Sequence, residues 1–173
     1  MNFQIVSDGA CDLLAEYTKP NQVSIVPFYV TFDGEHYEKE GVGIDHDEFY
    51  RRMAENHEIP KSSLPSAQDY IDAFLPFVEN KEPVICICIT SKFSGSYNSA
   101  VVAKDEILEN HPDARIEVID STLNTMSEAL LVVQAVKMRD SEYSYEDCIA
   151  KLNEIKTTGR IYFTVGSLEY LIK

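Results

Sequence analysis

The sequence predicts an α/β domain whose mostly parallel sheet has helices on both faces and carries a small β-hairpin arm. Three observations lead to this prediction. Strand-like and helix-like segments alternate along the 173 residues, which is typical of parallel sheets. Residues 83–89 ("PVICICI") are apolar throughout, as expected of a strand buried on both faces. Asp33-Gly34 follows an extended segment and is a hairpin turn signal.

The first two strands are expected at residues 3–7 ("FQIVS") and 23–32 ("VSIVPFYVTF"), because both segments are rich in β-branched and aromatic residues. Pro27 has no N–H to donate to a sheet, so it predicts an edge or a bend within the second segment. After the turn at Asp33-Gly34, residues 35–38 are expected to return as the second strand of a small hairpin.

Helices and strands then alternate to the end of the chain. Asp45, Ser66 and Ser144 are the expected N-caps of three helices, and Ser66-x-x-Asp69 resembles a capping box. The expected helices comprise residues 45–56, 67–80, 95–110, 125–139 and 145–157. The expected strands after residue 80 comprise residues 83–89, 115–120 and 160–165, and Ser167 is expected to cap a short final helix.

Charge and composition exclude several classes of partner. The chain has 15 basic and 29 acidic residues, a formal net charge of −14. No positive field follows from this balance, so we expect no nucleic-acid binding. There is no signal-peptide pattern and no apolar run of membrane-spanning length, so we expect a cytoplasmic protein without membrane insertion. The four cysteines are interpreted as small core residues.

Four polar clusters follow expected strands and mark a candidate binding edge. They are Ser7-Asp8-Gly9, Thr90-Ser91-Lys92, Asp120-Ser121-Thr122 and Gly166-Ser167. If the strands are parallel, all four clusters lie on the edge of the sheet where open α/β folds bind ligands. Turn and capping chemistry also explains each cluster taken alone. Their convergence is what indicates a site.

The stretch "ITSKFSGSYNSA" (residues 89–100) suits a small anionic group. Gly95 lies at a helix entry, where it permits close backbone approach and where free N–H groups attract anions. Hydroxyls of Thr90 and Ser91 can donate to a carboxylate or phosphate without adding charge. Residues 60–66 ("PKSSLPS") form a second hydroxyl-rich turn that leads into a helix.

Sequence patterns of known catalytic sites are missing. The chain contains neither a P-loop nor a G-x-S-x-G nucleophile elbow. The four histidines lie in polar contexts without metal-ligand spacing; they are His36, His46, His57 and His111. We therefore predict no catalytic residue, no metal and no cofactor, and the residues alone indicate an anion-binding α/β domain that is not an enzyme.

Several motifs, in this order along the chain, resemble the DegV family of bacterial fatty-acid-binding proteins. They are "IVSDGACDL", "IVPFYVTFDG", "PKSSLPSAQDYIDAF", "ITSKFSGSYNSAVVAK", "IEVIDS" and "VGSLEYLIK". The resemblance spans essentially the whole chain. The S-K-x-S-G-[ST]-Y-x-S-A and [ST]-S-x-P-S patterns are specific when they occur together.

The resemblance implies the first domain of a two-domain fold, with a long-chain fatty acid buried between the domains. It implies that hydroxyls from the two turns hold the fatty-acid carboxylate, and the matching positions here are Ser62 and Ser91. Ser63, Thr90, Gly95 and Asp8 would support them. It also implies a partner, a fatty acid kinase catalytic protein, to which the carrier presents the carboxylate for phosphorylation.

The chain departs from the family pattern in three ways. Gly9 follows Asp8 where the family usually has a serine, and Leu64 replaces a frequent glutamine. The family continues beyond "SLEYL" with a Gly-Gly-Arg segment and a second domain, whereas this chain ends at Lys173. We therefore expect residues 1–173 to be an N-terminal domain alone, either isolated or a natural short form, with a tunnel that lacks one wall.

Two alternatives stay open at this level. One is a small-molecule phosphotransfer or hydrolase domain related to dihydroxyacetone kinase, with Ser91 or Ser94 as the nucleophile. The other is an interaction module that self-associates through its C-terminal end, where Leu168 and Leu171 need cover.

Overall fold

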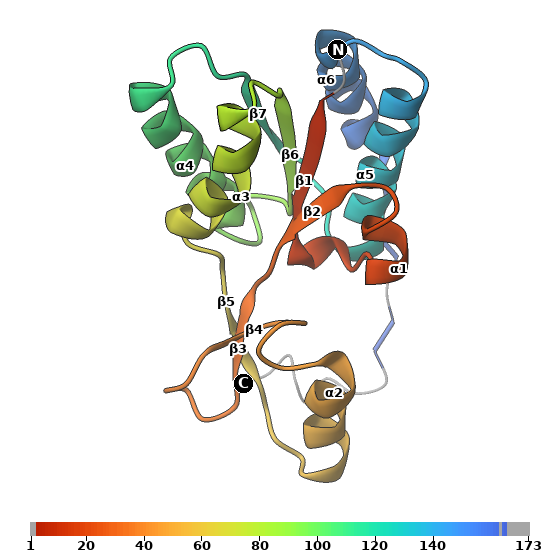
Figure 1. The fold of residues 1–173 in the computed structure, drawn as a ribbon. Coiled ribbons are helices and arrows are strands. Elements are labelled where there is room, and N and C mark those ends of the chain that lie inside the picture. The colour runs from red at the N-terminus through yellow and green to blue at the C-terminus, as the bar shows by residue number, and fades with distance from the viewer. Residues whose placement is uncertain (1–2, 163, 166–173) are drawn as a thin grey trace.

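The computed structural model describes residues 3–162, 164 and 165, and it divides them into a main lobe and a smaller arm (Figure 1). The main lobe is built on a four-stranded sheet in the order β2-β1-β6-β7, with every pair parallel. Its strands are β1 (Gln4–Asp8), β2 (Val23–Val26), β6 (Val84–Cys88) and β7 (Ile116–Asp120). The predicted fold class is confirmed.

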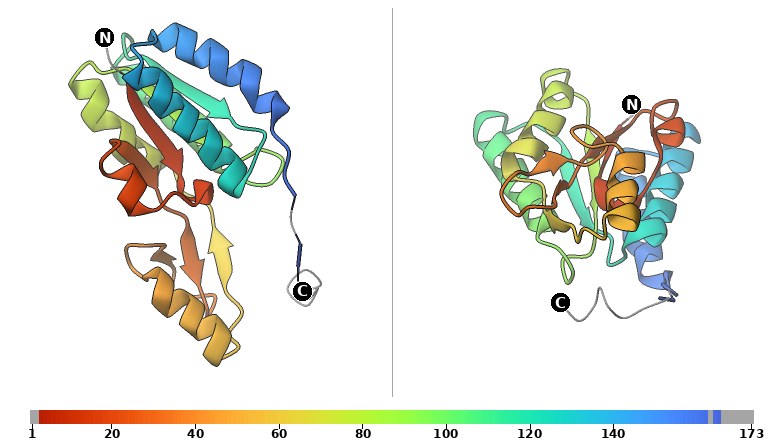
Figure 2. Two further views of the ribbon diagram at one scale, coloured as in Figure 1. Left: turned by 90° about the vertical axis from the view of Figure 1, so that its right-hand side faces the viewer. Right: turned by 90° about the horizontal axis from the view of Figure 1, so that it is seen from below.

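Helices cover both faces of this sheet (Figures 1 and 2). One face is covered by α3 (Ala67–Glu79) and α4 (Ser96–Asn110), and the other by α5 (Thr125–Asp140) and α6 (Tyr145–Ile155). Successive side chains of a strand point to opposite faces, so Ile85 and Ile87 pack with α5 and α6, while Cys86 and Cys88 pack with α3 and α4. Both faces of β6 are therefore buried, as its apolar run predicts.

Short elements complete the main lobe. A 3-10 turn, η1 (Gly9–Cys11), follows β1, and α1 (Ala15–Thr18) leads toward β2. A second 3-10 turn, η2 (Lys156–Thr158), extends α6. All four cysteines are buried and free, as expected of small core residues.

Residues 27–65, which we call the arm, leave the main lobe after β2 and return to it at α3 (Figure 1). The arm contains β3 (Tyr29–Thr31), β4 (Glu38–Lys39), α2 (His46–Glu55) and β5 (Lys61–Ser63). Its sheet has the order β4-β3-β5 and is antiparallel. The expected hairpin is present, but its returning strand is Glu38–Lys39 and residues 35–37, which the sequence also predicts in that strand, belong to the connection. The expected strand 23–32 is divided at Pro27, and its two halves belong to different sheets.

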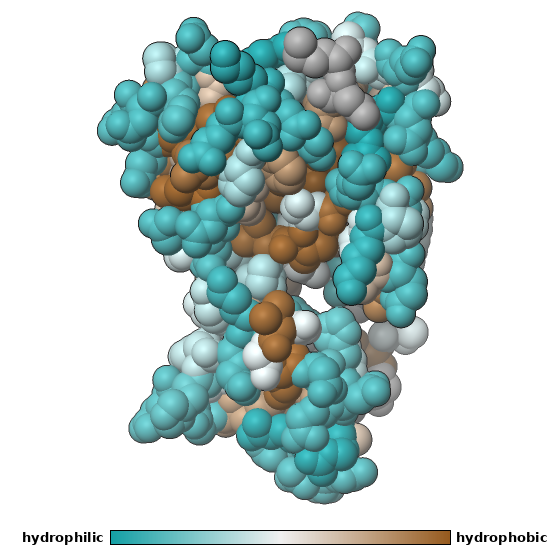
Figure 3. Space-filling model, in the orientation of Figure 1, coloured by the Kyte–Doolittle hydropathy of each residue, from teal (hydrophilic) through white to brown (hydrophobic). Residues whose placement is uncertain are grey.

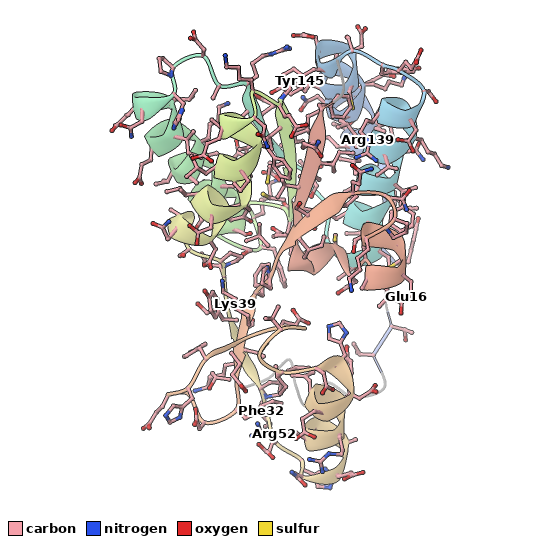
Figure 4. The ribbon with its side chains drawn as sticks, in the orientation of Figure 1. Glu16, Phe32, Lys39, Arg52, Arg139 and Tyr145 are labelled. Carbon is pink, nitrogen blue, oxygen red and sulfur yellow. The ribbon has the colours of Figure 1, made fainter. Side chains whose placement is uncertain are left out.

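The arm has a small packing centre of its own. The Arg52 guanidinium of α2 lies 3.9 Å from the centre of the Phe32 ring, and the Phe32 and Phe49 rings are 5.4 Å apart. Figure 4 shows Arg52 beside Phe32 in the lower part of the arm. A cation over an aromatic face is favourable, so α2 is fixed to the hairpin.

Asp69 joins the arm to the main lobe. It completes the capping box of α3 with Ser66, as expected, with aspartate in place of the usual glutamate. Its carboxylate also accepts from the Tyr29 hydroxyl at 2.9 Å and lies 2.7 Å from the Lys39 ammonium, and both partners belong to the arm. Lys39 lies at the junction of arm and main lobe in Figure 4. The contacts of Asp69 therefore attach the arm to the beginning of α3.

One expectation for the second half of the chain needs correction, and two side chains of α5 lie differently from what helical spacing suggests. The predicted strand 160–165 is wrong for the five positions that are described, because none of them is in a strand. Tyr162 is 92% exposed, and an extended segment without a neighbouring strand gains no ladder of hydrogen bonds. On α5, Met126 and Leu130 are exposed although their spacing suggests an apolar face. The expected final helix, with Ser167, Leu168 and Leu171, lies outside the described residues.

Candidate functional site

The carboxyl ends of β1, β6 and β7 lie together at one edge of the sheet. From β1 the chain crosses to β2 on one side, and after the arm and α3 it crosses to β6 on the other side. The sheet therefore changes its winding direction between β1 and β6, which is the place where open α/β sheets bind ligands. The clusters at Asp8, Ser91 and Asp120 all follow these strands. The Gly166-Ser167 cluster lies outside the described residues.

The structure buries Asp8 completely. One carboxylate oxygen of Asp8 accepts from the Ile89 N–H at 3.1 Å and from the Ser96 hydroxyl at 2.6 Å. Ile89 precedes the β6–α4 loop, and Ser96 is the first residue of α4. Asp8 thus holds both ends of the loop that carries Thr90, Ser91 and Gly95, so its contacts are with the scaffold of the site.

Ser91 is exposed in this loop and is paired with Asp120 at the end of β7. The Ser91 hydroxyl donates to Asp120 at 2.5 Å, and the Ser91 N–H donates to the other carboxylate oxygen at 3.2 Å. Asp120 also accepts from the Thr122 N–H at 2.9 Å. The hydroxyl can donate only one hydrogen bond. A ligand carboxylate can therefore accept a hydrogen bond from Ser91 only when the Ser91 side chain turns away from Asp120.

The second hydroxyl-rich segment reaches the same edge from the arm. Ser62 lies in β5 opposite Val30, and Ser63 lies opposite Tyr29. A Cβ atom added to Gly95 would come within 3.1 Å of the Leu64 side chain, so the Ser62 segment contacts the Ser91 loop. The predicted turn at residues 60–66 begins as a strand, which pairing with β3 explains. Ser62, Ser63 and Ser91 are all exposed.

Apolar surface accompanies these hydroxyls. In Figure 3, apolar side chains gather on the side of the main lobe that faces the arm. Phe93 in the Ser91 loop is 76% exposed, and Leu64, next to Ser63, is 40% exposed. Polar donors beside exposed apolar side chains suit a ligand with an anionic head and an apolar tail.

Burial and hydrogen bonds shift the pKa values of three carboxyl groups in and near this region. Burial raises the pKa of Asp8, although hydrogen bonds from Ser96 and Ile89 oppose this. Burial, followed by the charge of Asp8, raises the pKa of Glu128 in α5 to about 11. At the junction with the arm, burial works to raise the pKa of Asp69, but hydrogen bonds from Lys39 and Ser66 outweigh it and hold that pKa at about 2.

Sequence reasoning missed three residues of this region. Glu128 and Lys39 carry no motif, and Asp69 is recognisable from the sequence only as a helix cap. Asp120 stands out in the sequence as a carboxylate at a strand end, but its pairing with Ser91 depends on the order of β6 and β7. The capping pattern in the sequence therefore does not reveal that Asp69 also contacts the arm.

Two further observations concern the described residues alone. They contain no group of three or more His, Cys, Asp and Glu side chains placed to hold a metal ion. No helix among residues 3–162 combines the length and the apolar character needed to cross a membrane.

Comparison with curated proteins finds close relatives. A DegV domain-containing protein of Caldanaerobacter subterraneus is 34% identical over 169 residues, which are 98% of this chain and 58% of that protein. One of Lactococcus lactis is 30% identical over 174 residues, 60% of its length. The chain thus spans less than two thirds of the length of these relatives.

Comparison with solved structures also finds similar proteins. A stearic acid-binding protein of Eubacterium ventriosum is 51% identical, with a TM-score of 0.84 over 87% of this chain and 52% of that one. The fatty acid kinase (Fak) B3 protein of Streptococcus pneumoniae, loaded with linoleic acid, is 30% identical with a TM-score of 0.76, over 91% and 55% of the two chains. The family model "Uncharacterised protein, DegV family" matches residues 2–173. The chain therefore belongs to the DegV family.

Proposed function

We propose that this protein binds a long-chain fatty acid, with the carboxylate held by the hydroxyls of Ser62 and Ser91. The observation that carries the proposal is the contact between the Ser62 segment and the Ser91 loop, through Leu64 and Gly95, at the edge where the sheet changes its winding direction. Exposed apolar side chains beside these hydroxyls suit an acyl tail. Fatty-acid binding by the similar proteins of Eubacterium ventriosum and Streptococcus pneumoniae supports the same assignment.

Within this proposal the protein is a carrier that supplies no catalytic group. The Ser91 hydroxyl donates to the carboxylate of Asp120, and among the described residues no hydrogen bond of Ser91 involves a histidine, the base that commonly activates a serine nucleophile. A fatty acid kinase catalytic protein would phosphorylate the presented carboxylate, as the name of the Streptococcus pneumoniae relative suggests. The second wall around the acyl chain would come from a further domain, since the chain matches about half of these structures.

Organic extraction followed by mass spectrometry tests the proposal. The complete protein, purified from its native host, is expected to release a long-chain fatty acid in about equimolar amount. A preparation that releases none, and that also takes up no added stearic acid or linoleic acid, would contradict fatty-acid binding.

Ser91→Ala is expected to weaken fatty-acid binding by about 1–3 kcal/mol, because the bound carboxylate, covered by the ligand's own apolar tail, loses a hydrogen-bond donor. Isothermal titration of the complete protein with stearic acid measures the change. Ser141→Ala is the matched control, since Ser141 is exposed at the end of α5. Equal affinity in the two variants would remove Ser91 from the site.

Asp120→Asn is expected to strengthen fatty-acid binding by about 1 kcal/mol, the opposite direction to Ser91→Ala. The asparagine oxygen can still accept hydrogen bonds from the Ser91 and Thr122 N–H groups. Its NH₂ group cannot accept a hydrogen bond from the Ser91 hydroxyl, which is then free to donate to the ligand. The variant also removes a negative charge near the ligand carboxylate. The same titration measures this, and weaker binding by the variant would show that Asp120 helps to hold the ligand.

A further inference from the structure

Asp8 and Glu128 form a buried pair of acids beneath the Ser91 loop. Both residues are fully buried, and their carboxyl groups lie close enough for each to shift the pKa of the other. Three buried side-chain oxygens lack a partner among the described residues, namely Asp8 Oδ1, Glu128 Oε2 and Asn124 Oδ1. Two of these three belong to the pair, and one proton between them would satisfy both.

Among the described residues, the surroundings of the pair supply no positive charge. The titratable groups that face it from η1, β6 and α3 are Cys11, Cys88 and Tyr70. Burial raises the pKa of all three, so they are neutral at pH 7. Two adjacent carboxylates that are buried without a cation cannot both be ionised. The pair therefore keeps one proton.

Hydrogen bonding decides which acid keeps it. Asp8 accepts from the Ile89 N–H and from the Ser96 hydroxyl, and such donors favour the ionised form. Glu128 accepts only a long hydrogen bond of 3.4 Å from the Ser7 hydroxyl among the described residues. The proton belongs on Glu128, whose free oxygen then donates to the free oxygen of Asp8.

We propose that Glu128 is a positioning residue that carries a proton at neutral pH and, by donating it to Asp8, keeps Asp8 in place to hold both ends of the Ser91 loop. The effect on ligand binding rests on the proposed function, whereas the protonation of Glu128 does not. No group of this pair contacts the ligand in our assignment.

Two variants separate the proton from the bulk of the side chain. Glu128→Gln keeps an N–H donor toward Asp8, so stearic acid affinity is expected to stay within about threefold of the original protein. Glu128→Ala removes the donor, and affinity is expected to fall about tenfold. If the glutamine variant binds as weakly as the alanine variant, the donor is not what matters and the proposal is wrong.

Stability against pH gives an independent readout. The pKa of Glu128 rises on folding from 4.5 to about 11, so the chain takes up a proton when it folds at neutral pH. The folding equilibrium constant should therefore fall by about tenfold per pH unit between pH 6 and pH 9, relative to Glu128→Gln. Urea unfolding of both proteins at several pH values measures the difference, and parallel curves would contradict the proposal.

Infrared spectroscopy detects the proton directly and needs no ligand. A protonated carboxylic acid has a carbonyl stretch distinct from that of a carboxylate, and we expect one such buried band at pH 7 that is lost in Glu128→Gln. No such band at pH 7, or a band that persists in the variant, would overturn the assignment. A failure to bind fatty acid would leave this band unchanged, so the two proposals fail separately.

Discussion

Asp69→Ala is expected to lower the free energy of unfolding by about 3 kcal/mol and to release the arm from the main lobe. The variant loses the capping box of α3, typically about 1 kcal/mol, together with charge-assisted hydrogen bonds from Lys39 and Tyr29, worth about 1–3 kcal/mol. The Asp69 side chain is only 8% exposed, so water does not replace these partners well. Urea unfolding measures the loss, and faster proteolysis within residues 27–65 reports the released arm.

The matched control is Asp72→Ala on the same helix. Asp72 is exposed and accepts only from Gln68 among the described residues, so its removal should change stability by less than about 0.5 kcal/mol. Asp69 also gives a signed acid dependence. Its pKa is lowered on folding from 3.8 to about 2, so its contribution is complete above pH 4 and is lost as pH falls toward 2. Equal stability of the two variants at pH 7 would contradict the account of the junction.

Phe74→Ala is expected to lower the free energy of unfolding by about 3–5 kcal/mol, the usual cost of removing a buried aromatic side chain. Phe74 is fully buried between α3 and the sheet, and its ring centre lies 5.7 Å from that of Tyr70. Tyr70 in turn shares a hydrogen bond of 2.6 Å with Ser96 at the start of α4. The cavity therefore opens next to the scaffold of the Ser91 loop.

Phe93→Ala makes the same substitution at an exposed position. Phe93 is 76% exposed in the β6–α4 loop, so its loss should change the free energy of unfolding by less than about 0.5 kcal/mol. Thermal or urea unfolding of both variants measures the contrast. A small effect at Phe74 would mean that the α3 face of the core is not packed as described.

Much of the fold is predictable from the sequence because its signals are local or strongly periodic. The continuous apolar run of β6, the cap at Ser66 and the turn at Asp33-Gly34 each specify their element without knowledge of the rest. Pro27 indicates a bend, but only the structure shows that the chain changes sheets there. The strand predicted at residues 160–165 fails because a strand depends on its neighbours as well as on its own composition.

The candidate site is predictable only in part, for a related reason. Strand ends reveal Asp8, Ser91 and Asp120, since parallel strands bring their carboxyl ends to one edge. Their mutual contacts depend on strand order, which the sequence does not state. In the sequence, Glu128 is an ordinary acidic residue in the first turn of a helix. Its burial beside Asp8 cannot be predicted without knowing that α5 packs on β1.

A crystal structure of the complete protein with stearic acid would show whether Ser62 and Ser91 hold the carboxylate of a fatty acid. We expect carboxylate oxygens at hydrogen-bond distance, about 3 Å, from both hydroxyls, with the acyl chain running along the apolar surface that faces the arm. A carboxylate bound elsewhere, with Ser91 still donating to Asp120, would contradict this expectation.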